Sequence, residues 1–214
     1  MADEDSASTW VPHTRSLPRL REAATDCRGC ELWADATQVV FSAGTRKARI
    51  MLVGEQPGDV EDREGEPFVG PGGRILDDVL ERAGIDRREV YLTNAVKHFR
   101  HEMRGKRRIH QMPAVAHITA CRPWLEAEVA AVKPLVAVCL GATAGRAMLG
   151  RTVRVGAERG QVLEPDPRAV PGLSAVVLTS HPSSVLRLRE RSERASAVSS
   201  LVDDLRTAAA VRGT

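Results

Sequence analysis

The sequence predicts an α/β domain: a three-layer α/β/α sandwich around a central four-stranded, mainly parallel sheet. Two observations carry this prediction. Short apolar runs alternate with longer helical patterns, which is the order expected of βαβ units. Each run is also continuously apolar, as expected of a strand that is covered on both faces. The four runs, rich in Val, Leu or Ile, are residues 48–55, 89–96, 135–141 and 175–182.

Helical patterns fill the intervals between these strands. A short helix is expected from Pro18 to about residue 27, and residues 72–84 repeat apolar side chains at helical spacing before Gly84 ends the pattern. A longer pattern starts at Pro113, a residue favoured in a first helical turn, and Pro123 should kink or divide it. Further helices are expected at 141–150 and 192–212, with a hairpin or loop at 151–164.

The chain of 214 residues is long enough for one domain with a substantial core. We expect residues 1–17 to form a flexible lead-in and residues 18–214 to form a single domain, because neither a repeat nor a linker composition divides them. The start of the chain does not read as a signal peptide, and Lys133 and Pro134 interrupt the longest apolar stretch. We therefore expect a cytoplasmic protein with no membrane span.

The distinctive polar residues follow the predicted strands. GEQPGD (54–59) comes after the first strand, Asn94 and a basic segment after the second, Gly141 after the third and HPSS (181–184) after the fourth. Because ligands of open α/β sheets bind beyond the carboxyl ends of the strands, these residues are expected to share one binding edge.

Positive charge is concentrated in one segment. The net charge of the chain is only +3, yet six Lys or Arg residues and a single acid, Glu102, lie between Lys97 and Arg108. This patch favours contact with nucleic-acid phosphates, although a solvated charged loop would have the same composition. The segment ends at His110, which is either one more polar loop residue or a reactive group that the loop delivers.

Four cysteines leave several interpretations open. Cys27 and Cys30 form a CxxC pair, whereas Cys121 and Cys139 are single. A redox pair, a zinc site, an iron–sulfur site and buried free thiols are all compatible with this spacing. Structural disulfides are not expected in a cytoplasmic protein.

Several motifs together resemble the uracil-DNA glycosylase superfamily over roughly residues 20–205. They are GEQPG (54–58), PFVGPGGRILD (67–77), TNAVKHF (93–99), HPSSVLR (181–187) and the cysteine set. The likeness is closest to the iron–sulfur branch (family 4-like), and GEQPG together with an insert ending in KRRIH is similar to the UdgX class. Members of that class become covalently attached to uracil-DNA. The resemblance implies the uracil-DNA glycosylase fold and a structural 4Fe–4S cluster held by Cys27, Cys30, Cys121 and Cys139.

The resemblance also implies a pocket for a flipped uracil. Phe68 would stack on the base, and Asn94 would hydrogen-bond to N3–H and O4. His181 would donate to O2 and stabilise the departing anion. Gly54 and Gly58 would form a tight turn close to the base. Without the resemblance, Phe68 would read as a core residue, Asn94 as a cap and His181 as a turn residue.

The same resemblance assigns the chemistry. Where hydrolytic members carry an aspartate that activates water, this chain has Gln56, whose amide is not a base. Glu55 is expected to orient or deprotonate His110, and a neutral His110 imidazole is expected to attack C1′ and stay attached. Asp59 could assist through ordered water or Gln56, or could be a solvated loop acid.

The implied partner is uracil-containing DNA, single-stranded or duplex. Phosphate contacts are expected from Lys97, Lys106, Arg107, Arg108, Ser183 and Ser184, with Arg107 as the best candidate for positioning the loop. Nothing in the sequence indicates an obligate protein partner or more than a monomer. Two alternatives remain: a conventional hydrolytic 4Fe–4S uracil-DNA glycosylase with turnover, and a non-catalytic DNA- or nucleotide-binding protein of the same fold.

Overall fold

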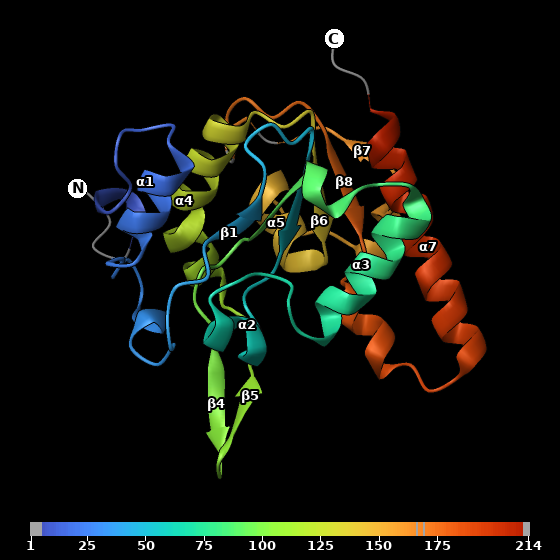
Figure 1. Ribbon diagram of the computed structural model, residues 1–214, viewed down its shortest axis with the longest axis horizontal. Coiled ribbons are helices and arrows are strands. Elements are labelled where there is room, and N and C mark those ends of the chain that lie inside the picture. Colours follow the sequence, from blue (N-terminus) through green and yellow to red (C-terminus); the bar gives the residue numbers. More distant parts are fainter. Residues whose placement is uncertain (1–5, 166, 169, 212–214) are drawn as a thin grey trace.

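A computed structural model describes residues 6–165, 167–168 and 170–211, and its centre is a six-stranded sheet in the order β1-β3-β2-β6-β8-β7 (Figure 1). The four inner strands run parallel to one another. They are β2 (Ile50–Gly54), β3 (Val90–Asn94), β6 (Val136–Leu140) and β8 (Val176–Thr179). Each lies within one of the predicted apolar runs, so the α/β class and the mainly parallel sheet are confirmed.

Two short edge strands were not predicted, and they raise the strand number from four to six. β1 (Ser42–Gly44) pairs antiparallel with β3, and β7 (Val162–Leu163) pairs antiparallel with β8. Strands of this length leave no alternating pattern in the sequence. The segment 151–164, expected to be a hairpin or loop, instead contains β7 and the short helix α6 (Val155–Glu158).

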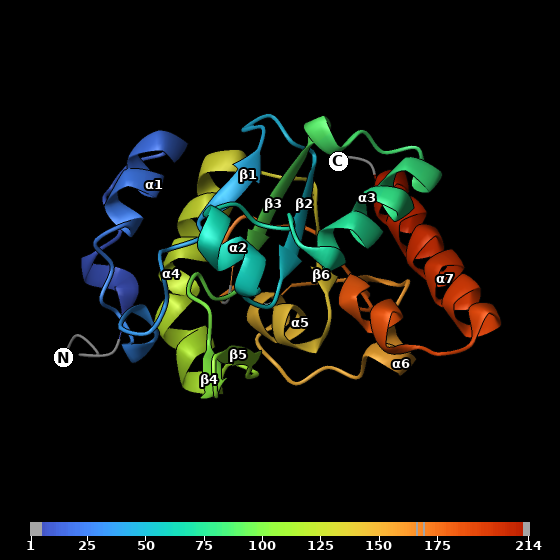
Figure 2. The ribbon, with the colours of Figure 1, turned by 60° about the horizontal axis from the view of Figure 1, so that its bottom comes forward.

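Helices cover both faces of the sheet (Figures 1 and 2). The helices α1 (Leu17–Ala24), α4 (Val115–Val132) and α5 (Ala142–Leu149) pack into one hydrophobic cluster. The helices α3 (Pro71–Ala83) and α7 (Arg191–Ala210) pack into a second one. Side chains alternate between the faces of a strand, so Cys139 of β6 faces the first cluster while Val138 faces the second. The three-layer sandwich is therefore confirmed.

Local signals account for most helix boundaries. α3 starts at Pro71 and ends at Gly84, which adopts the left-handed conformation (φ 75°) that glycine tolerates best. α4 contains Pro123 as one unbroken helix, so of the two expected effects of this proline, a kink or a division, the division does not occur. The helix α2 (Asp59–Glu64) follows β2 directly, and the 3-10 helix η4 (Pro182–Arg187) follows β8.

The described part of the expected lead-in belongs to the domain. The 3-10 helix η1 (Ala7–Thr9) packs against α4, and Ala7 is only 1% exposed. A Cβ at Gly29 would lie 2.6 Å from the backbone nitrogen of Ala7, so the two segments touch. The expectation of a loose segment up to residue 17 is corrected on this point, and residues 1–5 lie outside the described residues.

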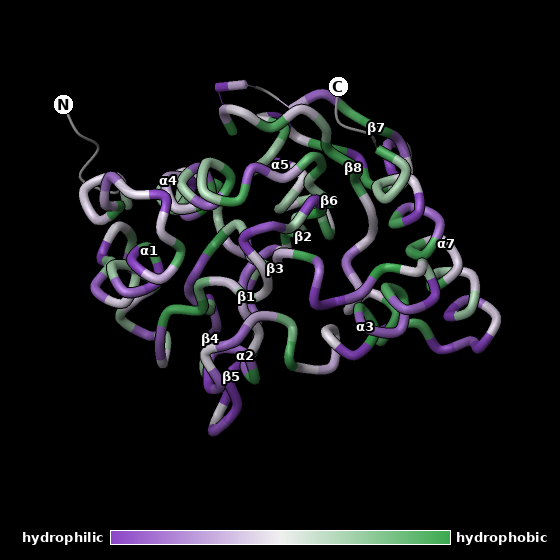
Figure 3. The backbone as a smooth tube through the Cα atoms, turned by 45° about the horizontal axis from the view of Figure 1, so that its top comes forward, coloured by the Kyte–Doolittle hydropathy of each residue, from purple (hydrophilic) through white to green (hydrophobic). Residues whose placement is uncertain are grey.

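The basic segment is a β-hairpin and not the loop that its composition suggested. β4 (His101–Arg104) pairs antiparallel with β5 (Arg107–His110), and Gly105 forms the turn with a φ of 62°. The hairpin projects from the body beside α2, and its tip is hydrophilic (Figures 1 and 3). Within the residues that the structure describes, no helix is both long and apolar enough to cross a bilayer.

Candidate active site

The predicted site residues gather at the carboxyl ends of the parallel strands. Gly54 ends β2 and is the register partner of Asn94 at the end of β3. A Cβ on Gly141, after β6, would lie 3.3 Å from the Cβ of His181, after β8. The binding edge expected from the sequence is therefore formed by segments that lie far apart in the chain.

Gly54, Phe68 and Asn94 are in close contact. A Cβ at Gly54 would lie 2.2 Å from Oδ1 of Asn94 and 2.7 Å from Cζ of Phe68, so only glycine fits there. Phe68 and Asn94 are 7% and 3% exposed. An aromatic ring and an amide are thus held side by side, the pair of groups expected for stacking on a base and reading its edge.

The backbone of Phe68 is held in an unusual conformation. Its φ of 58° lies in the left-handed region, which is rare for a bulky residue. Arg87 donates from Nη2 to the Phe68 carbonyl at 3.2 Å. A Cβ at Gly73 would lie 1.9 Å from the same oxygen, so α3 approaches this turn closely. Strained residues of this kind concentrate at functional sites. Arg87 and Gly73 were not among the predicted site residues.

His181 is a neutral imidazole with a defined tautomer. Burial lowers its pKa to about 4, although the nearby charge of Glu55 opposes this shift. The backbone N–H of Ser183 donates to Nδ1 at 3.2 Å, so Nδ1 carries no proton and Nε2 carries it. Ser183 Oγ also lies 2.7 Å from Nδ1. Ser183 therefore supports His181, and Ser184 donates its N–H to the His181 carbonyl at 2.9 Å.

Glu55 connects the sheet edge to the hairpin. His110 Nε2 lies 3.3 Å from Glu55 Oε1, and the Thr143 hydroxyl at the start of α5 donates to Oε2 of the same carboxylate. Burial raises the pKa of Glu55, but the hydrogen bonds from His110 and Thr143 outweigh that effect and hold the pKa below its usual value. The His110 side chain is 50% exposed, so it faces solvent beside a carboxylate. Thr143 is a site residue that sequence reasoning missed, because nothing separates it from an ordinary helix-start residue.

Gln56 holds the two ends of the hairpin together. Its Nε2 donates to the carbonyls of Arg100 at 3.1 Å and Gln111 at 3.0 Å, and its Oε1 accepts from Arg100 N at 3.1 Å. Both amide hydrogens are therefore used. An aspartate has no N–H to donate at this position, which gives a physical reason for the glutamine.

Arg108 is part of an ion-pair cluster, and its expected contact with DNA stays a prediction. Its side chain is 13% exposed and forms 2.5 Å contacts with Oδ1 of Asp59 and Oδ2 of Asp62. Asp59 also pairs with Arg63 at 3.2 Å. The carboxylate of Asp59 is thus occupied by two guanidinium groups, and it makes no contact with Gln56 that would support a catalytic role.

The expected DNA contact of Lys97 is wrong for a physical reason. Lys97 is 1% exposed, and its Nζ lies 2.5 Å from Oε2 of the buried Glu128. A side chain in the core does not reach a phosphate.

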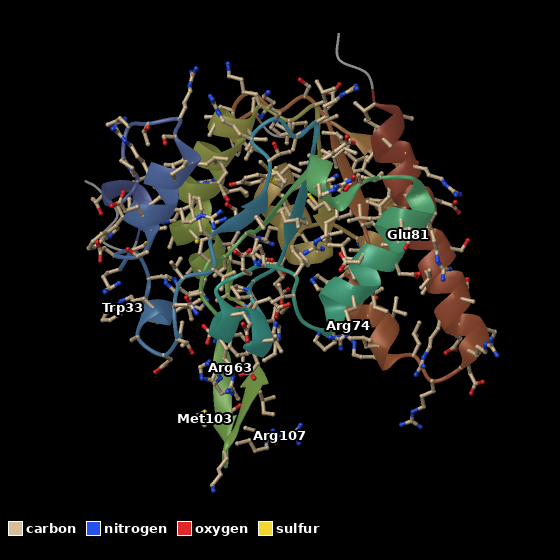
Figure 4. The ribbon with its side chains drawn as sticks, in the orientation of Figure 1. Trp33, Arg63, Arg74, Glu81, Met103 and Arg107 are labelled. Atoms are coloured by element: carbon tan, nitrogen blue, oxygen red, sulfur yellow. The ribbon has the colours of Figure 1, made fainter. Side chains whose placement is uncertain are left out.

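Lys106 and Arg107 are exposed on the hairpin, and Figure 4 shows Arg107 and Met103 pointing away from the body. Gly58 precedes α2, where a Cβ would lie 2.6 Å from Glu61 Oε2.

The four cysteines share one hydrophobic cluster but do not form a closed ligand set. Burial is the main cause that raises the pKa of Cys121 to about 12; Lys97 opposes the increase, and Cys30 and Cys27 contribute to it, so these three cysteines lie near one another. Cys139 is buried in β6, and burial alone raises its pKa. Lys97 N donates to Cys121 Sγ and Trp124 Nε1 donates to Cys27 Sγ, each at 3.3 Å. Within the described ranges, no group of three or more His, Cys, Asp or Glu side chains could hold a metal ion as placed.

Comparison with known proteins agrees with this geometry. A model of the Uracil DNA glycosylase superfamily matches residues 41–206. The "Type-4 uracil-DNA glycosylase" of Thermotoga maritima is 35% identical over 176 residues, which cover 82% of this chain and 85% of that protein. The protein of the same name from Pyrobaculum aerophilum is 31% identical over 176 residues, covering 80% and 85%. A third, from Sulfurisphaera tokodaii, is 39% identical over 127 residues, and the match spans about half of it (54%).

Proposed function

Because the chain belongs to the uracil-DNA glycosylase superfamily, we propose that it excises uracil from DNA and retains the abasic sugar as a covalent adduct on His110. The observation that carries the covalent part is the 3.3 Å contact between His110 Nε2 and Glu55 Oε1. It puts a nucleophile and a base within reach of each other. The substrate class rests on the family and on the Phe68–Asn94–His181 arrangement.

Recognition of the base would use the groups at the sheet edge. A flipped uracil stacks on Phe68, while the Asn94 amide accepts from N3–H and donates to O4. The buried position of both side chains supports this role, because a desolvated amide strongly disfavours a base that leaves it unpaired. With the amide in this orientation, the amino group that cytosine has in place of O4 would face the N–H of Asn94, so a donor would meet a donor.

Departure of uracil would depend on His181. As the bond between C1′ and N1 breaks, its electron pair leaves with uracil and negative charge grows on O2. The neutral His181 donates its Nε2–H to that oxygen, and the Ser183 N–H keeps Nδ1 in the required state. A preorganised donor of this kind stabilises the anion without rearrangement.

Capture of the sugar would depend on His110 and Glu55. His110 Nε2 forms its bond to the cationic C1′ and gives its proton to Glu55 Oε1 in the same step. Glu55 then passes this proton to the uracil anion, which leaves as neutral uracil. The products are free uracil and an N-glycosidic bond from His110 to the sugar.

Hydrolysis with turnover is the alternative, and the surroundings of Gln56 argue against it. Its amide is not a base, and both of its hydrogens are engaged with the hairpin backbone. A water molecule beside Gln56 would therefore have no carboxylate at this position to activate it.

We also propose that Cys27, Cys30 and Cys121 belong to an iron–sulfur site with a structural role. Their proximity and the N–H···S bonds from Lys97 and Trp124 support this, because such donors stabilise thiolate ligands. Cys139 is the weakest of the four expected ligands. The side chains as placed do not close around a metal, and no step proposed here uses the cluster.

A denaturing gel tests the proposed reaction. Purified protein is mixed with a uracil-containing oligonucleotide and boiled in detergent, with His110→Ala beside the wild type and a thymine oligonucleotide as control. We expect a boiling-resistant shifted band for the wild type on uracil DNA alone. Free abasic DNA produced over many turnovers, with no shifted band, would favour the hydrolytic alternative.

Colour and metal content test the cluster. Anaerobically purified protein should be brown and contain iron and acid-labile sulfide. Cys121→Ala should lose both, whereas Cys139→Ala should keep both if Cys139 is only a buried thiol. Loss of iron in Cys139→Ala would show that Cys139 is also a ligand of the cluster.

A further inference from the structure

Asp62 is a fully buried acid in a helix that the proposed chemistry does not use. It lies in α2, is 0% exposed, and its carboxylate contacts two parts of the chain that are remote from each other in sequence. Oδ2 lies 2.5 Å from Arg108 Nη1 of the hairpin. The backbone N–H of Thr37 donates to Oδ1 and Oδ2 at 3.0 and 3.1 Å. A buried carboxylate is costly unless it is paired in this manner.

Arg108 is held from several directions. Besides the pair with Asp62, its Nε lies 2.5 Å from Asp59 Oδ1, and its Nη1 donates to Thr37 Oγ1 at 3.0 Å. Its guanidinium also lies 5.4 Å from the centre of the Phe99 ring. The fork of an arginine in such a site has little freedom to move.

The geometry of β5 transmits this constraint to His110. Side chains at positions two apart in a strand point to the same face. Arg108 and His110 are such a pair, so fixing Arg108 toward α2 directs His110 to the same side, where it meets Glu55. The Phe99 ring lies under both, with 6.1 Å between its centre and that of His110. A slip of β5 by one residue would turn His110 to the opposite face.

We propose that Asp62 is a positioning residue for His110, acting through Arg108. The inference rests on the proposed function, since it concerns the delivery of the nucleophile. Without the charge of Asp62 the hairpin is less well oriented, and water then captures part of the sugar that His110 would otherwise trap. Uracil recognition is unaffected, because Phe68, Asn94 and His181 lie outside the hairpin.

The test measures two products in the same reaction: free uracil and the fraction of cleaved DNA that becomes adduct. Asp62→Asn keeps an oxygen for the Thr37 N–H and removes the charge that faces Arg108. We expect its ratio of adduct to free abasic DNA to fall about tenfold while uracil release changes by less than about twofold. Glu64→Gln, an exposed change in the same helix, should match the wild type.

A second variant covers the case in which Asp62→Asn does not fold. Arg108→Lys keeps the positive charge but removes the fork, and it should lower the same ratio with uracil release maintained. The inference is overturned if the ratio stays at the wild-type value in these variants, or if adduct and uracil release fall together. Absence of any adduct with the wild-type protein is a different result, since it overturns the proposed function itself.

Discussion

His110 and Glu55 come from different structural units, the projecting hairpin and the end of β2, yet Nε2 of the first lies 3.3 Å from Oε1 of the second. Glu55 is held on its other side by the Thr143 hydroxyl. The carboxylate is thus fixed by the rigid sheet and α5, while the imidazole arrives on the hairpin. Groups held from both sides in this way are preorganised, as the proposed capture of the sugar requires.

Thr143 should be needed for the orientation of Glu55. Thr143→Val removes the hydroxyl that donates to Oε2 and leaves a carboxylate oxygen without a partner. We expect adduct formation to be about tenfold slower, the size of effect typical of a lost hydrogen bond to a charged group. Single-turnover gel kinetics measure this, with Thr143→Ser as the control that keeps the hydroxyl. Equal rates for the Val and Ser variants would show that the hydroxyl is dispensable.

Gln56 should matter for the hairpin and not for water activation. Gln56→Asp places a carboxylate against the carbonyls of Arg100 and Gln111 and removes both donors. We expect faster hydrogen exchange at the Gln111 amide, which donates to Arg100 O, and a lower adduct yield. Gln111→Ala is the matched control, since it leaves the backbone carbonyl in place. A gain of multiple turnovers in Gln56→Asp would contradict this role.

Lys97 and Arg107 should respond differently to substitution. Lys97→Met leaves Glu128 buried without its cation, which should cost about 3–5 kcal/mol of unfolding free energy and leave the salt dependence of DNA binding unchanged. Arg107→Ala should leave stability nearly unchanged. It should reduce the steepness with which the logarithm of the DNA-binding constant falls with the logarithm of the salt concentration by about one. Denaturant titration and binding over a range of salt concentrations measure both. A reduced salt slope in Lys97→Met would restore Lys97 as a phosphate contact.

His181 should make stability depend on pH. Its pKa is lowered from 6.5 to about 4 in the folded protein, so the unfolded chain binds a proton first as the pH falls. Stability contributed by this group is therefore complete above about pH 6.5 and is lost as the pH falls toward 4. Between pH 6.5 and about 5 the wild type should lose about 2 kcal/mol more than His181→Gln. Parallel losses in the two proteins would contradict a neutral, buried imidazole.

Much of the architecture could be predicted because it depends on local and periodic signals. Continuous apolar runs indicated the four inner strands, and Pro71 and Gly84 bracket α3 through their own backbone preferences. The edge strands β1 and β7 escaped prediction, because two or three residues make no period and their pairing is set by the neighbouring strand.

Motifs were enough to predict which residues of the candidate site lie at one edge of the sheet, whereas contacts between distant segments were not predicted. Glu55, His110, Asn94 and His181 come together at the predicted edge. Lys97 looked like a phosphate ligand, and Arg108 like a residue free to bind DNA, because composition does not reveal that Glu128 and Asp62 lie opposite them. Partners from distant segments decide whether a basic residue is a DNA contact or a structural ion pair.

The most direct measurement is peptide mapping of the adduct by mass spectrometry. Wild-type protein is reacted with a short uracil oligonucleotide, then digested with nuclease and protease, and the modified peptide is fragmented. We predict that the added mass is that of the deoxyribose remnant without uracil, and that fragment ions place it on His110. A remnant on another residue, or only unmodified peptide after complete uracil release, would contradict the account.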